Sequence, residues 1–265
     1  MRRLIVAVVV LAGLLVVLDF SAAATAESTI SRQMRDRLSL PEDPSVRVNG
    51  VSFLAQAASG RYRSVDVSME RLPVGSLRSR EVTVQLHDLR APWAELSGSV
   101  PAPRFRVTDA RSVVSIGSGD VMRMVPGTKE LTLATVDANA IDEVVVDGGD
   151  PTLRGLDPRN AALITTTTTV RGEQRTIEVL AALQVTNDGL IRITPRDVRS
   201  GAVDLTAAET AALTEAFALV IDPGKLPFRV TPTTLRVDED GRLELSGQVK
   251  DLVVGEGDRS ASAQG

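Results

Sequence analysis

The chain has 265 residues, 43% of them apolar, and 30 basic against 34 acidic side chains give a net charge of −4. This length is sufficient for a sizeable core. Aromatic residues make up only 3%, which argues against nucleic-acid binding by base stacking, and the negative charge argues against non-specific attraction to nucleic acid. The absence of cysteine excludes disulfides, thiolate metal sites and thiol catalysis.

The N-terminus has the composition of an export segment. Arg2 and Arg3 precede an unbroken apolar run, residues 4–18, which ends at Asp19. Ala24-Thr25-Ala26 would provide a small-x-small cleavage site. The run is long for a signal and short of the roughly 20 residues that span a bilayer. We therefore expect residues 1–19 to be a signal peptide or an N-terminal membrane anchor, and the rest of the chain to lie outside the cytoplasm in the cell envelope. A buried helix of a cytoplasmic protein is the alternative, but so uniform a run would make a poor core helix.

The body of the chain predicts a leading helix followed mainly by strands. Ile30, Met34 and Leu38 recur at helical spacing, so residues 20–38 read as a helix that Pro41 and Pro44 stop. Apolar stretches then predict strands at residues 46–48, 65–69, 82–86, 112–116, 131–136, 144–146, 163–170, 177–185, 190–193, 234–237 and 243–245. Asn187-Asp188-Gly189 and Asp240-Gly241 indicate hairpin turns between the last two pairs.

Two further helices interrupt the strands, at residues 119–125 and 206–221. The second opens with Thr206 and Glu209, which have capping-box spacing, and its apolar face is predicted to include Val220 and Ile221. Residues 255–265 are small and polar, so we expect a disordered tail. Because no clear linker is visible, residues 20–254 are predicted to form a single domain.

The segment from residue 44 to residue 69 is the part of the sequence that says most about a possible binding site. Alternating strands flank a short apolar stretch in which Val51, Leu54, Ala55 and Ala58 recur at helical spacing. This spacing predicts a short helix with those four residues on its apolar face, and Gly60 is expected to end it. A strand, an apolar flap and a second strand could wall and cover a hydrophobic pocket.

No pattern of catalytic or metal-binding residues stands out. His87 is the only histidine, lies at a predicted strand end and lacks an accompanying G-x-S-x-G motif, so it reads as a surface residue. The acidic stretch 137–150 lacks the spacing of a calcium loop and is read as a solvated face. We therefore expect no catalytic residue, no metal and no cofactor. A carboxylate-based extracytoplasmic hydrolase remains an alternative, because paired carboxylates carry no distinctive spacing.

The order of several short motifs resembles an actinobacterial cell-envelope family, the LmeA-like phospholipid-binding proteins. The motifs are Ala26-Glu27 in the leading helix, VRVNGVSFL at 46–54, GRY at 60–62, VDV at 65–67, LPF at 226–228 and DGRLEL at 240–245. The resemblance covers residues 20–254 and departs from the family at Val51-Ser52, where a Gly/Phe-Pro pair is commoner. It implies an α+β fold of the tubular lipid-binding (TULIP-like) superfamily, in which a long curved antiparallel sheet wraps around a long helix.

The same resemblance implies binding of membrane phospholipids, including phosphoinositides, and a link to the maturation of mannose-containing envelope glycolipids. On this basis we expect a non-enzymatic lipid-binding or lipid-transfer protein whose partners are a phospholipid, a membrane surface and an envelope glycosyltransferase. The expected lipid contacts are Phe53, Leu54, Ala57, Tyr62, Leu213, Phe217, Leu226 and Phe228, with Arg61 and Arg63 near the headgroup. The competing interpretation of the apolar residues is ordinary core packing. The competing function is an envelope scaffold or accessory protein that binds no lipid.

Overall fold

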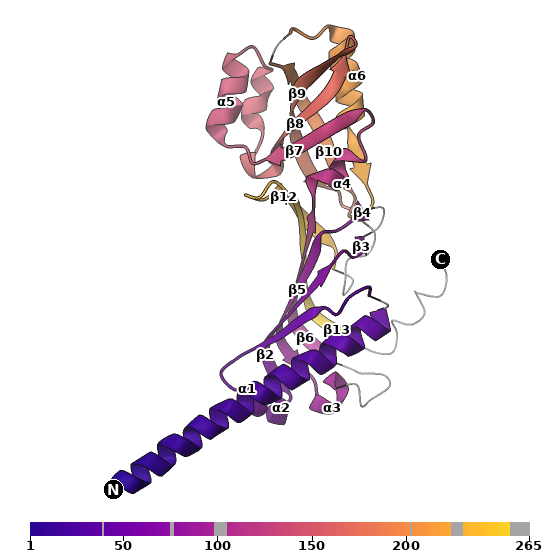
Figure 1. The fold of residues 1–265 in the computed structure, drawn as a ribbon. Coiled ribbons are helices and arrows are strands. Elements are labelled where there is room, and N and C mark those ends of the chain that lie inside the picture. Colours follow the sequence, from indigo (N-terminus) through magenta and orange to yellow (C-terminus); the bar gives the residue numbers. More distant parts are fainter. Residues whose placement is uncertain (39, 75–76, 98–104, 202, 224–229, 255–265) are drawn as a thin grey trace. The chain divides into compact units, whose positions relative to one another are not determined.

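The computed structural model describes residues 1–38, 40–74, 77–97, 105–201, 203–223 and 230–254. The protein is α+β, with a long N-terminal helix and strongly curled antiparallel sheets, as the sequence predicted (Figure 1). The chain divides into two compact units, each described here by itself. The first comprises residues 1–70, 83–112 and 248–265, and the second comprises residues 71–82 and 113–247. A single domain over residues 20–254 therefore stays a prediction.

The secondary structure is mainly β, with six helices in the described residues. The helices are α1 (Arg2–Leu38), α2 (Phe53–Ser59), α3 (Trp93–Leu96), α4 (Ser118–Met122), α5 (Ala138–Val146) and α6 (Ala207–Phe217), with the 3-10 turns η1 (Pro151–Gly155) and η2 (Pro158–Asn160). The strands are β1 (Ser45–Asn49), β2 (Arg61–Glu70), β3 (Pro73–Val74), β4 (Leu77–Arg78), β5 (Glu81–Arg90), β6 (Phe105–Ile116), β7 (Thr128–Ala134), β8 (Ala161–Val170), β9 (Glu173–Val185), β10 (Ile191–Ser200), β11 (Leu219–Ile221), β12 (Pro232–Val237) and β13 (Leu243–Val254).

The strands form a six-stranded sheet in the order β1-β2-β5-β6-β13-β12, a five-stranded sheet in the order β11-β10-β9-β8-β7, and the small β3-β4 pair. The hairpins predicted around Asn187-Asp188-Gly189 and Asp240-Gly241 are confirmed. They join β9 to β10 and β12 to β13, and both glycines have positive φ. This φ is accessible to glycine at little cost, which is why the turn residues could be recognised in advance.

The first unit is built on a valine-rich strand pair and the long helix. β1 and β2 are antiparallel, with Val46 opposite Val67 and Val48 opposite Val65, and alternate residues of β2 are buried, as period-two patterning requires. Helix α1 packs against β1 and α2. The predicted helix 20–38 is the second half of this single 37-residue helix, which continues the apolar run without a break.

The second unit corrects the predicted strand at residues 144–146, which belongs to helix α5. The Asp137 side chain accepts a hydrogen bond from the Ala140 N–H at 2.7 Å and begins the helix. Ile141 is buried with Leu153 and Leu180, and Val144 and Val145 pack against the same cluster. The spacing of residues 141, 144 and 145 is helical, whereas the valine run alone had suggested a strand.

Helix α6 also ends earlier than predicted, at Phe217. Val220 and Ile221 lie in strand β11, where Ile221 pairs with Ile191 of β10 and is buried, while Val220 is exposed. The β-branched residues of this segment suit a strand better than the last turn of a helix. The other predicted helix, at residues 119–125, is α4, which ends at Met122.

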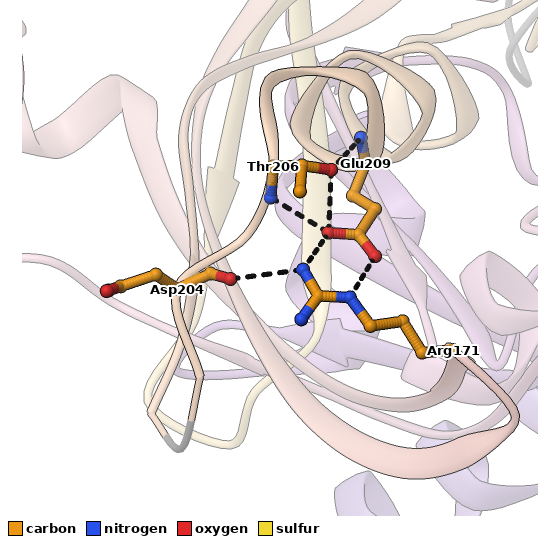
Figure 2. Close-up of polar contacts among 4 residues, drawn as sticks. All are labelled: Arg171, Asp204, Thr206 and Glu209. Atoms are coloured by element: carbon orange, nitrogen blue, oxygen red, sulfur yellow. Dashed lines mark hydrogen bonds and ion pairs between the residues drawn. The ribbon is translucent and has the colours of Figure 1, made fainter.

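The start of α6 is fastened to the turn between β8 and β9 by a network of hydrogen bonds (Figure 2). Thr206 and Glu209 form the predicted capping box: the Thr206 N–H donates to Glu209 Oε2 at 2.8 Å, and the Glu209 N–H donates to Thr206 Oγ1 at 3.3 Å. Arg171 donates from Nε and Nη2 to the two oxygens of the same carboxylate at 2.7 and 2.6 Å. The arginine and the capping bonds lower the pKa of Glu209 from 4.5 to about 2.

This pKa shift predicts acid-sensitive stability. Because the folded-state pKa is depressed, the contribution of Glu209 is fully present above pH 4.5 and is lost as the pH falls towards about 2. Glu209→Gln should therefore lower the thermal midpoint at pH 7, and the difference from the wild type should shrink between pH 4.5 and pH 2. Circular dichroism melts across that range would measure it. Glu215→Gln, an exposed change on the same helix, is the matched control and should leave the profile unaltered.

Candidate functional site

Helix α2 is fixed at its N-terminus by one carboxylate of helix α1. Asp19 Oδ1 accepts hydrogen bonds from Ser52 Oγ and from the Leu54 N–H, both at 2.8 Å, and Oδ2 accepts from the Phe53 N–H at 2.9 Å. Ser52 in turn accepts from the Ala55 N–H at 3.2 Å as the N-cap residue. The backbone bonds to Leu54 and Phe53 lower the pKa of Asp19 below its ordinary value of 3.8. The free N–H groups of the first turn are thereby satisfied.

The other end of α2 is fixed by Gly60 and by a side-chain bond. Gly60 adopts a left-handed φ of 64° as predicted for a helix-ending glycine, and its carbonyl accepts from the Ala91 N–H at 3.0 Å. Gln56 Oε1 accepts from the Arg63 N–H at 2.9 Å, which ties the middle of the helix to strand β2. A seven-residue helix has little stability of its own, so these contacts hold it in place.

The buried face of α2 is the opposite of the predicted one. Val51, Leu54, Ala55 and Ala58 are all exposed, Val51 to 98%. The buried residue is Phe53, whose ring lies edge-on to the Trp93 ring of α3 at 5.6 Å between centroids. The reason is the position of the N-cap: the helix begins only after Ser52, which leaves Val51 outside it and turns Phe53 inward.

An open hollow of about 500 Å³ lies beside α2 within the first unit. Its lining residues are Gly50, Val51, Ser52, Ala55, Gln56, Arg61, Tyr62, Arg63, Asp88, Leu89 and Arg90. The three arginines are exposed, and within the described part of the chain none of them forms an ion pair. With Asp88 as the one acidic residue of the lining, the hollow has an excess of positive charge.

Tyr62 is the buried polar residue of this lining. Its side chain is 1% exposed, and among the described residues its hydroxyl has no hydrogen-bond partner. Burial raises the pKa of this phenol above 10.0, so it is a neutral donor at physiological pH. A buried hydroxyl without a partner is costly and calls for an explanation, such as a ligand that accepts its hydrogen bond.

A second, smaller hollow of about 200 Å³ in the second unit has different chemistry. Its two arginines are already paired: Arg171 with Glu209 and Arg175 with Glu173. The hollow beside α2 is therefore the better candidate for an anionic ligand. Within the described ranges there is no group of three or more histidine, aspartate or glutamate side chains that could hold a metal.

The structure gathers six of the residues predicted from sequence in the first unit. They are Phe53, Leu54 and Ala57 on α2, and Arg61, Tyr62 and Arg63 at the start of β2. Leu213 is half-buried and Phe217 buried on α6 of the second unit. Leu226 and Phe228 lie outside the described residues. Whether these residues contact lipid stays a prediction.

Sequence reasoning missed Asp19, Trp93 and Arg90. Asp19 had been treated only as the residue that ends the apolar run, although a lone acid at that place, followed later by a serine N-cap, is a signal for a cap supplied from elsewhere. Trp93 is the only tryptophan, and its position just after a strand gave no indication that it meets Phe53. Arg90 ends β5, and only the sheet order brings that strand beside β2.

Comparison with known proteins decides the family. The family model described as LmeA-like phospholipid-binding matches residues 17–248, most of the chain. The chain belongs to this family. The resemblance inferred from the short motifs is thus confirmed, and phospholipid is the class of ligand that the LmeA-like family supports. No curated protein and no solved structure matches the chain. The matched stretch includes Asp19, α2 and every residue of the arginine-lined hollow.

The geometry at Gly60 predicts a clear stability effect. A Cβ added there would lie 3.2 Å from the Ala91 carbonyl oxygen, in a backbone conformation with φ of +64°. Gly60→Ala should therefore lower the free energy of unfolding by about 1–2 kcal/mol, measured by urea denaturation. Gly119→Ala is the matched control, because no atom lies within 4 Å of its added Cβ. That change lies in helix α4 and should be neutral or stabilising by up to about 1 kcal/mol.

Proposed function

We propose that this LmeA-like protein is an extracytoplasmic phospholipid-binding and transfer protein that carries out no covalent step. The observation that carries the proposal is the hollow beside α2, whose lining includes Arg61, Arg63, Arg90 and Tyr62. Among the described residues the buried hydroxyl of Tyr62 has no hydrogen-bond partner. Guanidinium groups bind phosphate oxygens with two parallel hydrogen bonds. A phosphodiester headgroup would satisfy both the arginines and the tyrosine.

We propose that the hollow takes the headgroup, on account of its size and its charge. About 500 Å³ is typical of a small-molecule site, and its arginine rim is unsuited to acyl chains. We assign the acyl chains to the apolar predicted residues: Phe53, Leu54 and Ala57 near the hollow, and Leu213, Phe217, Leu226 and Phe228 further along the chain. Each methylene removed from water contributes about 0.8 kcal/mol, so the chains supply most of the affinity and the hollow supplies the choice of headgroup.

Tyr62→Phe separates a binding role from a structural one. The hydroxyl has no partner in the described residues, so its removal should leave the free energy of unfolding unchanged or raised. If the hydroxyl donates to a lipid oxygen, affinity for phospholipid should fall roughly tenfold, the value of one hydrogen bond. Urea denaturation and titration with phospholipid would measure the two effects. Unchanged lipid affinity would remove Tyr62 from the site.

The arginine rim is tested by a lipid-transfer assay. Purified protein is mixed with donor and acceptor vesicles of phosphatidylcholine containing phosphatidylglycerol or phosphatidylinositol, and co-purifying lipid is identified by native mass spectrometry. Arg61→Gln with Arg63→Gln should reduce transfer of the anionic lipids at least tenfold at low salt, and by less at high salt because ions screen exposed charges. Arg159→Gln, a 91% exposed arginine in η2, is the control.

Two results would overturn the proposal. One is the consistent absence of bound lipid together with no uptake from any vesicle, which would favour an envelope scaffold. The other is normal lipid transfer in the double arginine variant, which would move the headgroup site elsewhere.

We further propose that the lipid held is an envelope phospholipid, phosphoinositides included, and that binding supports maturation of mannose-containing glycolipids of an actinobacterial envelope. In this proposal the protein presents its lipid to an envelope glycosyltransferase. What supports it is membership of the LmeA-like phospholipid-binding family together with the positively charged lining of the hollow. Deleting the gene in its native host should shorten or deplete these glycolipids. The wild-type chain should restore them and the double arginine variant should not.

A further inference from the structure

The apolar run and the folded first unit share one helix. Residues 4–18 have no charged side chain, and each is exposed. Among the described helices α1 alone is long and apolar enough to cross a membrane, and none of its most apolar stretch is buried in the protein. The same helix then continues to Leu38 and packs against β1 and α2 (Figure 1).

Cleavage at the small-x-small motif would damage this unit. The cut after Ala26 would fall in the middle of α1, at a residue that is 3% exposed. It would also remove Asp19, leaving Ser52 Oγ and the N–H groups of Phe53 and Leu54 without their acceptor. The stretch matched by the family model likewise begins at residue 17, before Asp19.

Three exposed apolar residues belong to, or are adjacent in sequence to, the residues of the Asp19 cap. Phe20 follows Asp19 and is 73% exposed, Val51 precedes Ser52 and is 98% exposed, and Leu54, whose N–H bonds to Asp19, is 45% exposed. We call these three residues the collar. Exposed apolar residues near the end of an apolar helical run are typical of a surface that enters the interfacial layer of a membrane.

We propose that helix α1 is retained in the mature protein as a membrane anchor. Asp19 then fixes α2 at the outer surface of that membrane, so that the collar enters the outer leaflet beside the arginine-lined hollow. The partner of this surface is therefore the bilayer from which the anchor emerges. The inference extends the proposed function, because it names the side from which a phospholipid headgroup would reach Arg61 and Arg63. Membrane retention itself does not depend on lipid transfer.

The length and charge of the run are compatible with this arrangement. Fifteen helical residues rise about 22 Å, shorter than the roughly 30 Å hydrocarbon layer. Arg2 and Arg3 can extend their side chains to the headgroups on the cytoplasmic side, and a short anchor also thins the bilayer locally at modest cost. Asp19 then lies at the outer interface, where a carboxylate with three hydrogen bonds is tolerated, and the collar occupies the layer around it.

The first test is the mass of the mature protein. The full chain with a C-terminal tag is produced in a bacterial host and purified from membranes washed with carbonate. Intact mass spectrometry should show residues 2–26 still present, with the protein in the membrane fraction. A mature chain that begins at Glu27 and is recovered in the soluble fraction would overturn the proposal.

The second test locates the collar. Because the chain has no cysteine, single labels can be placed at Val51→Cys and Leu54→Cys, with Arg111→Cys on β6 of the same unit as the exposed control. An environment-sensitive fluorophore should report an apolar setting at residues 51 and 54 when the full chain is in phosphatidylglycerol-containing vesicles, and water at residue 111. Water at all three positions would overturn the placement of the collar.

The third test addresses the Asp19 cap. Asp19→Ala should speed amide hydrogen exchange at Phe53 and Leu54 roughly tenfold and reduce the apolar signal of the Leu54→Cys label. Asp36→Ala, an exposed acid further along the same helix, is the control and should change neither. Unchanged exchange in Asp19→Ala would overturn the role of the cap. If the wild-type chain transfers no lipid but is retained in the membrane and has slow amide exchange at Phe53 and Leu54, the result would count against the proposed function alone.

Discussion

The first unit depends on a carboxylate that serves a segment more than thirty residues away. Asp19 accepts hydrogen bonds from residues 52, 53 and 54, and so turns a seven-residue peptide into a helix with a defined position. A helix of that length cannot hold itself together in water, because nucleation costs more than its few hydrogen bonds return. The position of α2, and hence one wall of the hollow, is therefore imposed from outside the segment.

The hollow next to α2 suits reversible binding. Its arginines come from β2 and β5, neighbours in the six-stranded sheet, so a stable framework spaces the charges. The tyrosine is buried and neutral, and offers a hydrogen-bond donor without the cost of burying another charge. Such a site can attract a phosphate through the charge of its arginines and orient it through one hydrogen bond from the tyrosine hydroxyl.

Most of the strands could be predicted from sequence, because alternation such as Val65, Val67 and Met69 records which side of a sheet is buried. The capping box at Thr206 and the turn at Gly189 were predictable for a similar reason: the interacting atoms are three or four residues apart. Prediction failed where the deciding partner is distant in the chain. The valines of α5 looked like a strand until Leu153 and Leu180 showed what they face.

The same distinction holds within the site. Arg61, Tyr62 and Arg63 could be named in advance because they are contiguous and follow a helix-ending glycine. The inward turn of Phe53 could not, because it depends on Ser52 as N-cap and on Trp93. The lack of a hydrogen-bond partner for the Tyr62 hydroxyl among the described residues could not be predicted either, because it depends on how distant segments pack.

Strand β1 is the outermost strand of the six-stranded sheet, and helix α1 lies against it. Glu27 on this helix accepts a hydrogen bond from the Val48 N–H at 2.7 Å, and Ser31 donates to the Pro44 carbonyl at 2.5 Å. An uncovered outer strand offers its backbone to any passing chain and invites strand-to-strand aggregation. Helix α1 therefore covers this outer strand and restricts access to its backbone. At the other side of the sheet β12 begins with Pro232, which has no N–H to offer a further strand. Both outer strands of the sheet thus carry features that disfavour pairing with a second copy of the chain.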